Sequence, residues 1–225
     1  MSPSDFVAAV QSGDVEKVRR ELSGNPSLAT ARDESGVSAI MHAFYRRQHE
    51  IADLLVAAKP DLDIFEATAA GKADRVLVIL RTDLESMTRR SADGFTALHF
   101  AAFFNRPEVA RELIVRGADI AAVADNAMKV APLHSAAAAG SREIVRLLLA
   151  AGAPVNARQH GGWTALHAAA ANGDMEMTCD LLAHGADLEA ANREGQTAVN
   201  IAQAKGHTDV MRLLQSSAKP SQVGG

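Results

Sequence analysis

The chain has 225 residues, a formal net charge of −4, and a composition that is 48% hydrophobic and 4% aromatic. A balance so close to neutral gives no electrostatic reason to expect a nucleic acid or an anionic membrane as partner. The single cysteine, Cys179, excludes an intramolecular disulfide, whereas the apolar content is ample for one helical core.

The first residues show no targeting or membrane signal. Met1–Asp5 lacks the basic start and apolar core of a signal peptide. No stretch of the chain approaches the ~18 consecutive apolar residues that a membrane-spanning helix needs. We therefore expect a cytoplasmic protein.

The N-terminal half of the chain contains an internal duplication. Residues 1–60 match the sequence 58 positions later, and the register does not slip. The match indicates that a short helical pair and one fuller repeat were copied together. Between Asp61 and Ile64 no room is left for a connecting turn, so we predict a gap in the row of turns at this point. Matched pairs include Gly13 and Gly71, Gly36 and Gly94, and Leu55 and Leu113.

From residue 96 onward, a four-residue phrase returns at steps of 35, 33 and 33 residues. A fixed period in this range is typical of one supersecondary unit stacked on copies of itself. The threonine that opens the phrase suits a helix N-cap, and the histidine one turn later can bond back to the same backbone. The copies are Thr96–His99, Ala131–His134, Thr164–His167 and the altered Thr197–Asn200.

The residues after the phrase predict two helices per unit. Gly173 tolerates a positive φ and ends the first helix, and Asp174 caps the second. The pattern from Gly162 to Asp187 closely resembles the ankyrin repeat. The resemblance implies about 33 residues per unit, in which a turn or hairpin finger precedes two antiparallel helices. We therefore predict an all-α ankyrin-repeat solenoid of about seven helix–turn–helix units with short β-hairpin fingers.

The predicted units follow one another over residues 1–217, which we expect to form a single domain. A longer finger is expected within Ala124–Val130, where two extra residues are inserted. The small and polar residues 218–225 are expected to form a disordered tail. The predicted units span residues 3–33, 34–62, 63–91, 92–125, 126–159, 160–192 and 193–217.

The eight histidines do not form a metal or catalytic site in this interpretation. The resemblance gives His99, His134 and His167 a structural role, and a spacing of about 10 Å between repeats is too large for them to share a zinc ion. His42, beside Met41 where the phrase would place a histidine, has no catalytic partner at a recognisable spacing. We expect no catalytic residues, no metal site and no cofactor.

The remaining candidate groups also favour structural roles. Cys179 lies within a predicted second helix, where a buried or half-buried inert thiol is expected. No glycine cluster forms a phosphate-binding loop followed by Lys and Ser or Thr. The histidines expected on the surface, in loops or at helix ends, are His49, His160, His184 and His207.

A concentration of aromatic residues is the strongest functional signal. Four of the seven phenylalanines lie between Phe95 and Phe104. In ankyrin relatives, partners usually bind the concave face made by the finger tips and the exposed side of the first helices, and exposed aromatic side chains anchor interfaces. The alternative is that Phe103 or Phe104 packs against the third unit, in space left by Ala69 and Ala70. The predicted partner-binding residues are Tyr45, Arg46, Phe95, Phe103, Phe104 and Trp163.

We therefore predict a noncatalytic module, expected to be a monomer, that binds a protein partner. Two alternatives stay open: a small enzyme or metal-binding protein, and a self-associating structural protein whose aromatic patch forms a homodimer. We also expect a weak joint at Asp63–Leu80. In this unit Arg75 stands where neighbouring units place Ile or Val, and the Thr–His pair is missing.

Overall fold

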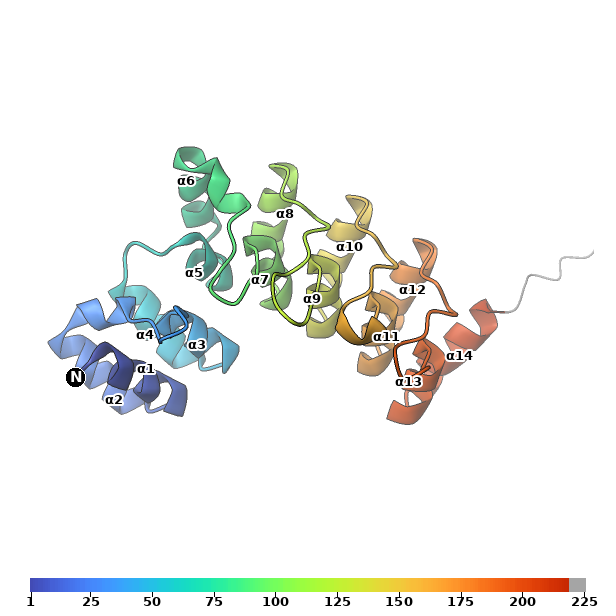
Figure 1. Cartoon of the computed structure of the whole chain (residues 1–225), viewed down its shortest axis with the longest axis horizontal. Helices are drawn as coiled ribbons and strands as arrows, with labels where there is room; N and C mark the ends of the chain where they lie inside the picture. Colours follow the sequence, from blue (N-terminus) through green and yellow to red (C-terminus); the bar gives the residue numbers. More distant parts are fainter. Residues whose placement is uncertain (219–225) are drawn as a thin grey trace, which may run out of the picture. The chain divides into compact units, whose positions relative to one another are not determined.

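The computed structural model describes residues 1–218, and in this range it contains 14 α-helices, three short 3-10 helices and no β-strand (Figure 1). The all-α class expected from the sequence is confirmed. The described chain forms two compact units, Met1–Leu113 and a second that begins at Ile114. Of the expected tail at 218–225, all but Ala218 lies outside the described residues.

In the first compact unit, helices pack in consecutive pairs, α1 with α2, α3 with α4 and α5 with α6. The first members of the pairs also pack on one another, so α1, α3, α5 and α7 form one row. The elements are α1 (Pro3–Ser12), α2 (Val15–Gly24), η1 (Pro26–Thr30), α3 (Ala39–Tyr45), α4 (His49–Ala58), α5 (Ile64–Ala69), α6 (Ala73–Thr82), η2 (Leu84–Met87), α7 (Ala97–Phe103) and α8 (Pro107–Val115), whose last residues belong to the second unit.

The second compact unit repeats this arrangement. The pairs are α9 with α10, α11 with α12 and α13 with α14, and the first helices again form a row, α9, α11 and α13. Second helices pack on one another as well, α10 on α12 and α12 on α14. The elements are α9 (Pro132–Ala139), α10 (Arg142–Ala150), η3 (His160–Gly162), α11 (Ala165–Asn172), α12 (Met175–Ala183), α13 (Ala198–Lys205) and α14 (Thr208–Ser217).

Helix ends follow from local chemistry at the boundary residues. Asp174 caps α12, since its side chain accepts a hydrogen bond from the N–H three residues later (3.0 Å). Gly173 ends α11 with φ = 67°, and a Cβ at this position would lie 2.6 Å from Nδ1 of His207. Asn105 takes the same left-handed conformation after α7 (φ = 52°), and Pro107 starts α8.

The duplication seen in the sequence reappears in the backbone. Asn25 and Asp83, 58 positions apart, follow α2 and α6 in nearly the same conformation (φ −151°, ψ 89° and φ −148°, ψ 84°). Each residue leads into a 3-10 helix, η1 or η2. The two copies therefore fold alike in this segment.

The connections between repeats are tight turns. In four of them the first N–H donates to the carbonyl four residues later, at 2.8–3.0 Å. A single isolated β-bridge, Arg32 to Ser38, occurs in the described chain, so the β-hairpin form of the fingers is not confirmed. The turn closed between Ala124 and Val130 spans six positions, so a longer connection lies where the longer finger was expected. The shorter turns are Asp33–Val37, Ser91–Phe95, Gln159–Trp163 and Asn192–Gln196.

Candidate functional site

The histidines of the repeated phrase tie each repeat to the next one. Nδ1 of His134 accepts a hydrogen bond from the N–H of Ala131 (3.0 Å), so the ring carries its proton on Nε2, which donates to the carbonyl of Ala157 (2.9 Å). His167 makes the corresponding bonds at 3.1 and 3.0 Å, the second to the carbonyl of Gln196. Burial lowers the pKa of both imidazoles below its ordinary value. These two histidines hold the fold together.

Within residues 1–218, the two copies of the phrase without histidine are those that no further turn follows in the next repeat. Met41 precedes the repeat in which Asp61–Ile64 leaves no room for a turn. Asn200 is followed, in the part of the chain that the structure describes, by α14 alone. Asn200 keeps the inner bond, since its Oδ1 accepts from the N–H of Thr197 (2.9 Å). In the part of the chain that the structure describes, absence of the histidine thus accompanies absence of a following turn.

Two side chains differ from their expected surroundings. Cys179 is exposed rather than buried, because Met177 and Thr178 occupy the inward face of α12. His207 is not a free surface residue, since its Nε2 lies 3.1 Å from the carbonyl oxygen of Ala171. Its ring covers the end of α11 and adds another tie between repeats.

His42 has an acidic partner that its sequence spacing did not reveal. Its Nε2 lies 2.7 Å from Oδ2 of Asp33, and the amide nitrogen of Gln11 lies 3.4 and 3.3 Å from its two ring nitrogens. Burial alone would raise the pKa of Asp33, but hydrogen bonds from His42 and from the N–H groups of Val37 and Ser35 hold it below its ordinary value. The pair fastens the turn at Asp33–Val37 to α3.

Aromatic side chains of α3 and α7 meet across the short helix α5. The ring centroid of Phe104 lies 5.6 Å from that of Phe44 and 5.8 Å from that of Tyr45. The third repeat carries only Ala69 and Ala70 at the positions where the flanking repeats carry larger side chains. We call this group the aromatic cluster. Its members are Phe44, Tyr45, Phe65, Phe95, Phe100, Phe103 and Phe104.

The six predicted partner-binding residues differ in their exposure to solvent and in the compact unit to which they belong. Arg46 is exposed, and so is Phe103, whose exposed fraction is 48%. Trp163 belongs to the second compact unit, where it is half-buried with its ring 5.6 Å from that of His167. The remaining three, Tyr45, Phe95 and Phe104, belong to the aromatic cluster and are half-buried.

Tyr45 is also fixed through its hydroxyl group. The hydroxyl donates to Oδ2 of Asp93, and the other oxygen of this carboxylate accepts from Oγ of Ser91 (2.5 Å). Burial and the hydrogen bond to Asp93 raise the pKa of Tyr45 above its ordinary value, so the phenol remains a donor. Tyr45 therefore joins α3 to the turn at Ser91–Phe95.

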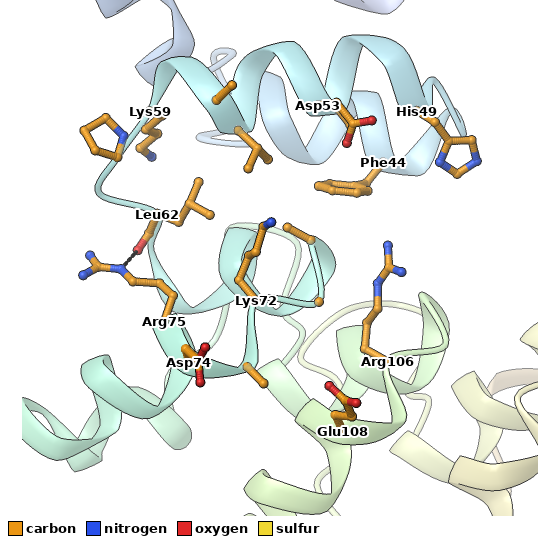
Figure 2. A pocket seen from close by; sticks show the side chains of 17 residues that line it. Phe44, His49, Asp53, Lys59, Leu62, Lys72, Asp74, Arg75, Arg106 and Glu108 are labelled. Atoms are coloured by element: carbon orange, nitrogen blue, oxygen red, sulfur yellow. Dashed lines mark hydrogen bonds between the residues drawn. The ribbon is translucent and has the colours of Figure 1, made fainter.

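A cleft of about 940 Å³ separates α4 from the starts of α6 and α8 (Figure 2). At three other junctions, second helices pack on each other: α2 on α4, α10 on α12 and α12 on α14. Figure 2 shows Lys72 and Arg106 pointing into the cleft from the side opposite α4. The α4 wall includes Ala52, Asp53, Val56 and Ala57.

Ion pairs join α2 to α4 and α10 to α12, and they follow one register. An arginine at the fifth position of one second helix pairs with a glutamate at the second position of the next. In the second compact unit, the first position of α10 also pairs with the N-cap residue of α12. The pairs are Arg19–Glu50 at 2.7 Å, Arg146–Glu176 at 3.3 Å and Arg142–Asp174 at 2.8 Å.

The same positions of α4 and α6 do not carry opposite charges. The fifth position of α4 and the second position of α6 are Asp53 and Asp74, and the first position of α4 and the N-cap of α6 are His49 and Lys72. Two carboxylates disfavour close approach of the helices that carry them. Arg106 donates from Nε to the carbonyl of Ala69 (2.8 Å), and burial lowers its pKa. The arginine and glutamate that pair at the other junctions are thus replaced here by two aspartates.

A buried ion pair holds the connection from α4 to α5, and sequence reasoning missed it. Oε2 of Glu66, whose side chain is 1% exposed, lies 2.5 Å from Nζ of Lys59. Arg32 lies 2.9 Å from Asp63, the N-cap of α5, and Nε of Arg75 donates to the carbonyl of Leu62 (3.0 Å). The available signal was the spacing of Asp63 and Glu66, which form a capping box.

Within residues 1–218, no group of three or more His, Cys, Asp or Glu side chains is arranged to hold a metal ion. None of the helices in this range has the length and apolar character needed to cross a membrane.

Comparison with known proteins agrees with this architecture. The family profile of ankyrin repeats (three copies) matches residues 64–159 and 133–223, more than half of the chain. The chain is 30% identical over 164 residues to the ankyrin repeat domain-containing protein SAT10 of Stachybotrys chartarum, which covers 71% of this chain and 8% of that protein.

Two further relatives differ in how much of their own length is matched. The putative ankyrin repeat protein FPV014 of fowlpox virus is 27% identical over 163 residues, or 68% of this chain and 36% of the viral protein. The probable 26S proteasome regulatory subunit p28 of Saccharomyces cerevisiae is 27% identical over 183 residues, or 74% of this chain and 78% of the yeast protein. The chain thus spans a minor part of the first two relatives. By its repeated helix pairs and by the matched family profile, the chain belongs to the ankyrin repeat family.

Proposed function

We propose that this protein is a noncatalytic interaction module that binds a partner protein through the face formed by the turns and first helices of its first compact unit. The observation that carries the proposal is the exposure of Phe103, 48%, on top of otherwise half-buried or buried aromatic rings. A large apolar side chain held on a packed support loses little freedom on binding, which suits a binding hot spot. Ankyrin repeats generally serve as protein-interaction modules.

The predicted residues take different parts in the proposal. Phe103 and Arg46, both exposed, contact the partner directly. Tyr45, Phe95 and Phe104 support them from the aromatic cluster, and Trp163 offers a further contact on the second compact unit. The yeast relative, of which the chain covers 78%, is named as a subunit of a larger assembly, which supports a role in protein contacts. The proposal includes a cytoplasmic monomer with one domain of about seven repeats over residues 1–217.

A capture experiment tests the proposed face. Immobilised protein is exposed to lysate of the native cell, and the bound proteins are compared with those bound by Phe103→Ala and Arg46→Ala. We expect both variants to lose the partner while their thermal transition stays unchanged, because neither side chain is buried. Leu84→Ala is the matched control, since Leu84 is an exposed apolar residue (59%) away from the aromatic cluster.

If Phe103→Ala captures the same proteins as the natural chain, the assignment of the binding face is wrong. Phe104→Ala is included as a variant that should change stability. Its ring is half-buried, so this variant is expected to lose about 2–3 kcal/mol of unfolding free energy, below the cost at a fully buried site. Light scattering across a range of protein concentrations distinguishes the proposal from self-association. Self-association through the aromatic cluster predicts that the measured mass doubles as the concentration rises and that Phe103→Ala prevents this doubling.

A further inference from the structure

A second cavity, of about 330 Å³, lies in the first compact unit where one turn of the row is missing. The turns at Asp33–Val37 and Ser91–Phe95 border it from both sides. A Cβ added to Gly36 would lie 3.4 Å from Cβ of Ala92, so these two turns approach each other directly. The cavity remains between the turns and the helices behind them. This geometry follows from the missing turn at Asp61–Ile64.

The helix side of the cavity is apolar. Met41 from α3 and Phe100 from α7 line it and are buried, and Phe65 from α5 is half-buried beside them. The rings of Phe65 and Phe100 lie 5.8 Å apart at nearly a right angle. Met41 stands where the repeated phrase would place a histidine, so the break in the phrase also removes a polar group from this surface. An aromatic ring would find apolar contacts here.

The charged residues of the lining leave one cation without an acidic partner. Arg32 is paired with Asp63 (2.9 Å), and Asp93 is bonded by Ser91 and Tyr45. Arg90 donates from one terminal nitrogen to the carbonyl of Gly94 (3.2 Å). Among the described residues no carboxylate lies within ion-pair distance of Arg90, which lines the cavity and is exposed. Its remaining N–H groups are available to a carboxylate from outside.

The cavity is continuous with the face to which the proposed function assigns partner binding. Tyr45 and Phe100 belong both to its lining and to the aromatic cluster. Its volume lies at the lower end of the range for ligand sites, roughly 300–1,000 Å³. A site of this size accepts one side chain rather than an extended cofactor.

We propose that this cavity receives an aromatic side chain of the partner protein, with an adjacent carboxylate of the partner bound by Arg90. The ring packs on Met41, Phe65 and Phe100, and the carboxylate accepts hydrogen bonds from the guanidinium group. This inference rests on the proposed function and names the chemistry of the segment that the face recognises.

A small probe tests the cavity without the partner. The full chain, labelled with ¹⁵N, is titrated with N-acetylphenylalanine and, separately, with N-acetylphenylalanine amide, and amide shifts are followed by NMR. We expect the acid to shift the amides of Arg90, Ser91 and Ala92 with an affinity in the millimolar range, as for other ligands of about 15 atoms. The amide should bind about fivefold more weakly, the upper end for an exposed ion pair.

Matched variants make the test specific. Arg90→Gln should remove the difference between acid and amide, whereas Arg89→Gln should keep it, because Arg89 is paired with Asp83 (2.9 Å). Ala92→Phe places a ring at the mouth of the cavity and should abolish binding of both probes. Ala92 is exposed, so this variant should keep the spectrum of a folded chain.

Three results would overturn the inference: no shifts up to 20 mM probe (~20 times the expected dissociation constant), equal binding of acid and amide to the natural chain, or unchanged binding to Ala92→Phe. The capture experiment with Phe103→Ala involves no probe. A negative result for the cavity proposal can therefore be distinguished from a negative result for the proposed binding face.

Discussion

At the scale of single residues, the repeated phrase works through an imidazole that must stay neutral. In His134 and His167, Nδ1 accepts a hydrogen bond within the repeat and Nε2 donates to a carbonyl in the connection to the next repeat. Protonation of Nδ1 would replace an acceptor with a donor that faces an N–H group. Asn200 can substitute where only the inner bond is needed, since its Oδ1 is an acceptor at any pH.

This chemistry predicts how stability depends on pH. Burial lowers the pKa of His134 and His167 in the folded state below the ordinary value of about 6.5 in the unfolded chain. The unfolded state therefore binds more protons, and the contribution is complete above about pH 6.5 and is lost as pH falls through the folded pKa values. We expect urea-unfolding free energies to decrease from pH 7.5 to pH 5.

Replacing both histidines provides the check. His134→Asn/His167→Asn should keep the inner bonds, lose the outer ones at a cost of about 1 kcal/mol each at pH 7.5, and flatten the decrease toward pH 5. His184→Asn serves as control, because His184 is exposed and bonds only to the preceding turn of its own helix. An equally steep decrease in the double variant would show that other groups carry the pH dependence.

At the scale of helices, the cleft between α4 and α6 is set by which charges occupy a common register. Arg19–Glu50 and Arg146–Glu176 bridge adjacent second helices, whereas the same positions of α4 and α6 carry Asp53 and a second aspartate. The apolar wall of α4 would otherwise allow close packing, since Ala52, Val56 and Ala57 are small. Charge, rather than bulk, distinguishes this junction.

Restoring the register should therefore close the cleft. Asp53→Arg replaces a like-charged pair with an arginine that can reach Asp74, and we expect a gain of ~0.5 kcal/mol in unfolding free energy at low salt. The gain should shrink in 1 M NaCl, where exposed charges are screened within about 3 Å. We also expect slower amide hydrogen exchange in α4 and α6 of Asp53→Arg, because the two helices would then pack on each other.

Two companion variants separate pairing from relief of repulsion. Asp53→Asn removes the repulsion without adding a partner, so it should give a smaller gain than Asp53→Arg. Asp53→Arg/Asp74→Arg should cancel the gain by setting two cations against each other. If the double variant is as stable as Asp53→Arg, the register is not what keeps this junction open.

At the scale of the whole molecule, the parts that the sequence predicted are those set by local signals. Each helix pair depends on a cap such as Asp174, a left-handed residue such as Gly173 or Asn105, and a phrase of four residues, and all of these act within one repeat. The longer finger was predictable for the same reason. The insertion at Ala124–Val130 lengthens one turn without altering its neighbours.

The features that sequence reasoning missed or left open depend on contacts between repeats. Packing of Phe103 or Phe104 beside Ala69 and Ala70 was one of two alternatives, but no local pattern encodes that the ring of Phe104 reaches Phe44 across α5. The exposure of Cys179 depends on which face of α12 turns inward, and the partner of His42 lies in a turn nine residues earlier. The cavity behind the missing turn was foreseeable as a gap, but its lining by Met41 and Arg90 required the packed structure.

The third repeat should be the least protected part of the described chain. Its first helix has only six residues, and no turn precedes it. Its second helix, α6, is separated from α4 by the cleft, and Arg75 of α6 donates a hydrogen bond to the carbonyl of Leu62, in the connection before α5. In the second compact unit, α10 and α12 pack on each other and share the ion pairs of Arg142 and Arg146. Local opening free energies follow such differences in buried contact.

Hydrogen exchange followed by mass spectrometry measures this directly. Peptides from Phe65–Leu80 should exchange faster than peptides from Leu147–Leu182 under native conditions, and Asp53→Arg should narrow the difference by packing α4 on α6. Uniform protection in the natural chain would contradict a weak third repeat. A difference that Asp53→Arg leaves unchanged would instead place the weakness in the short α5 and its missing turn, because those features are independent of the charges in the cleft.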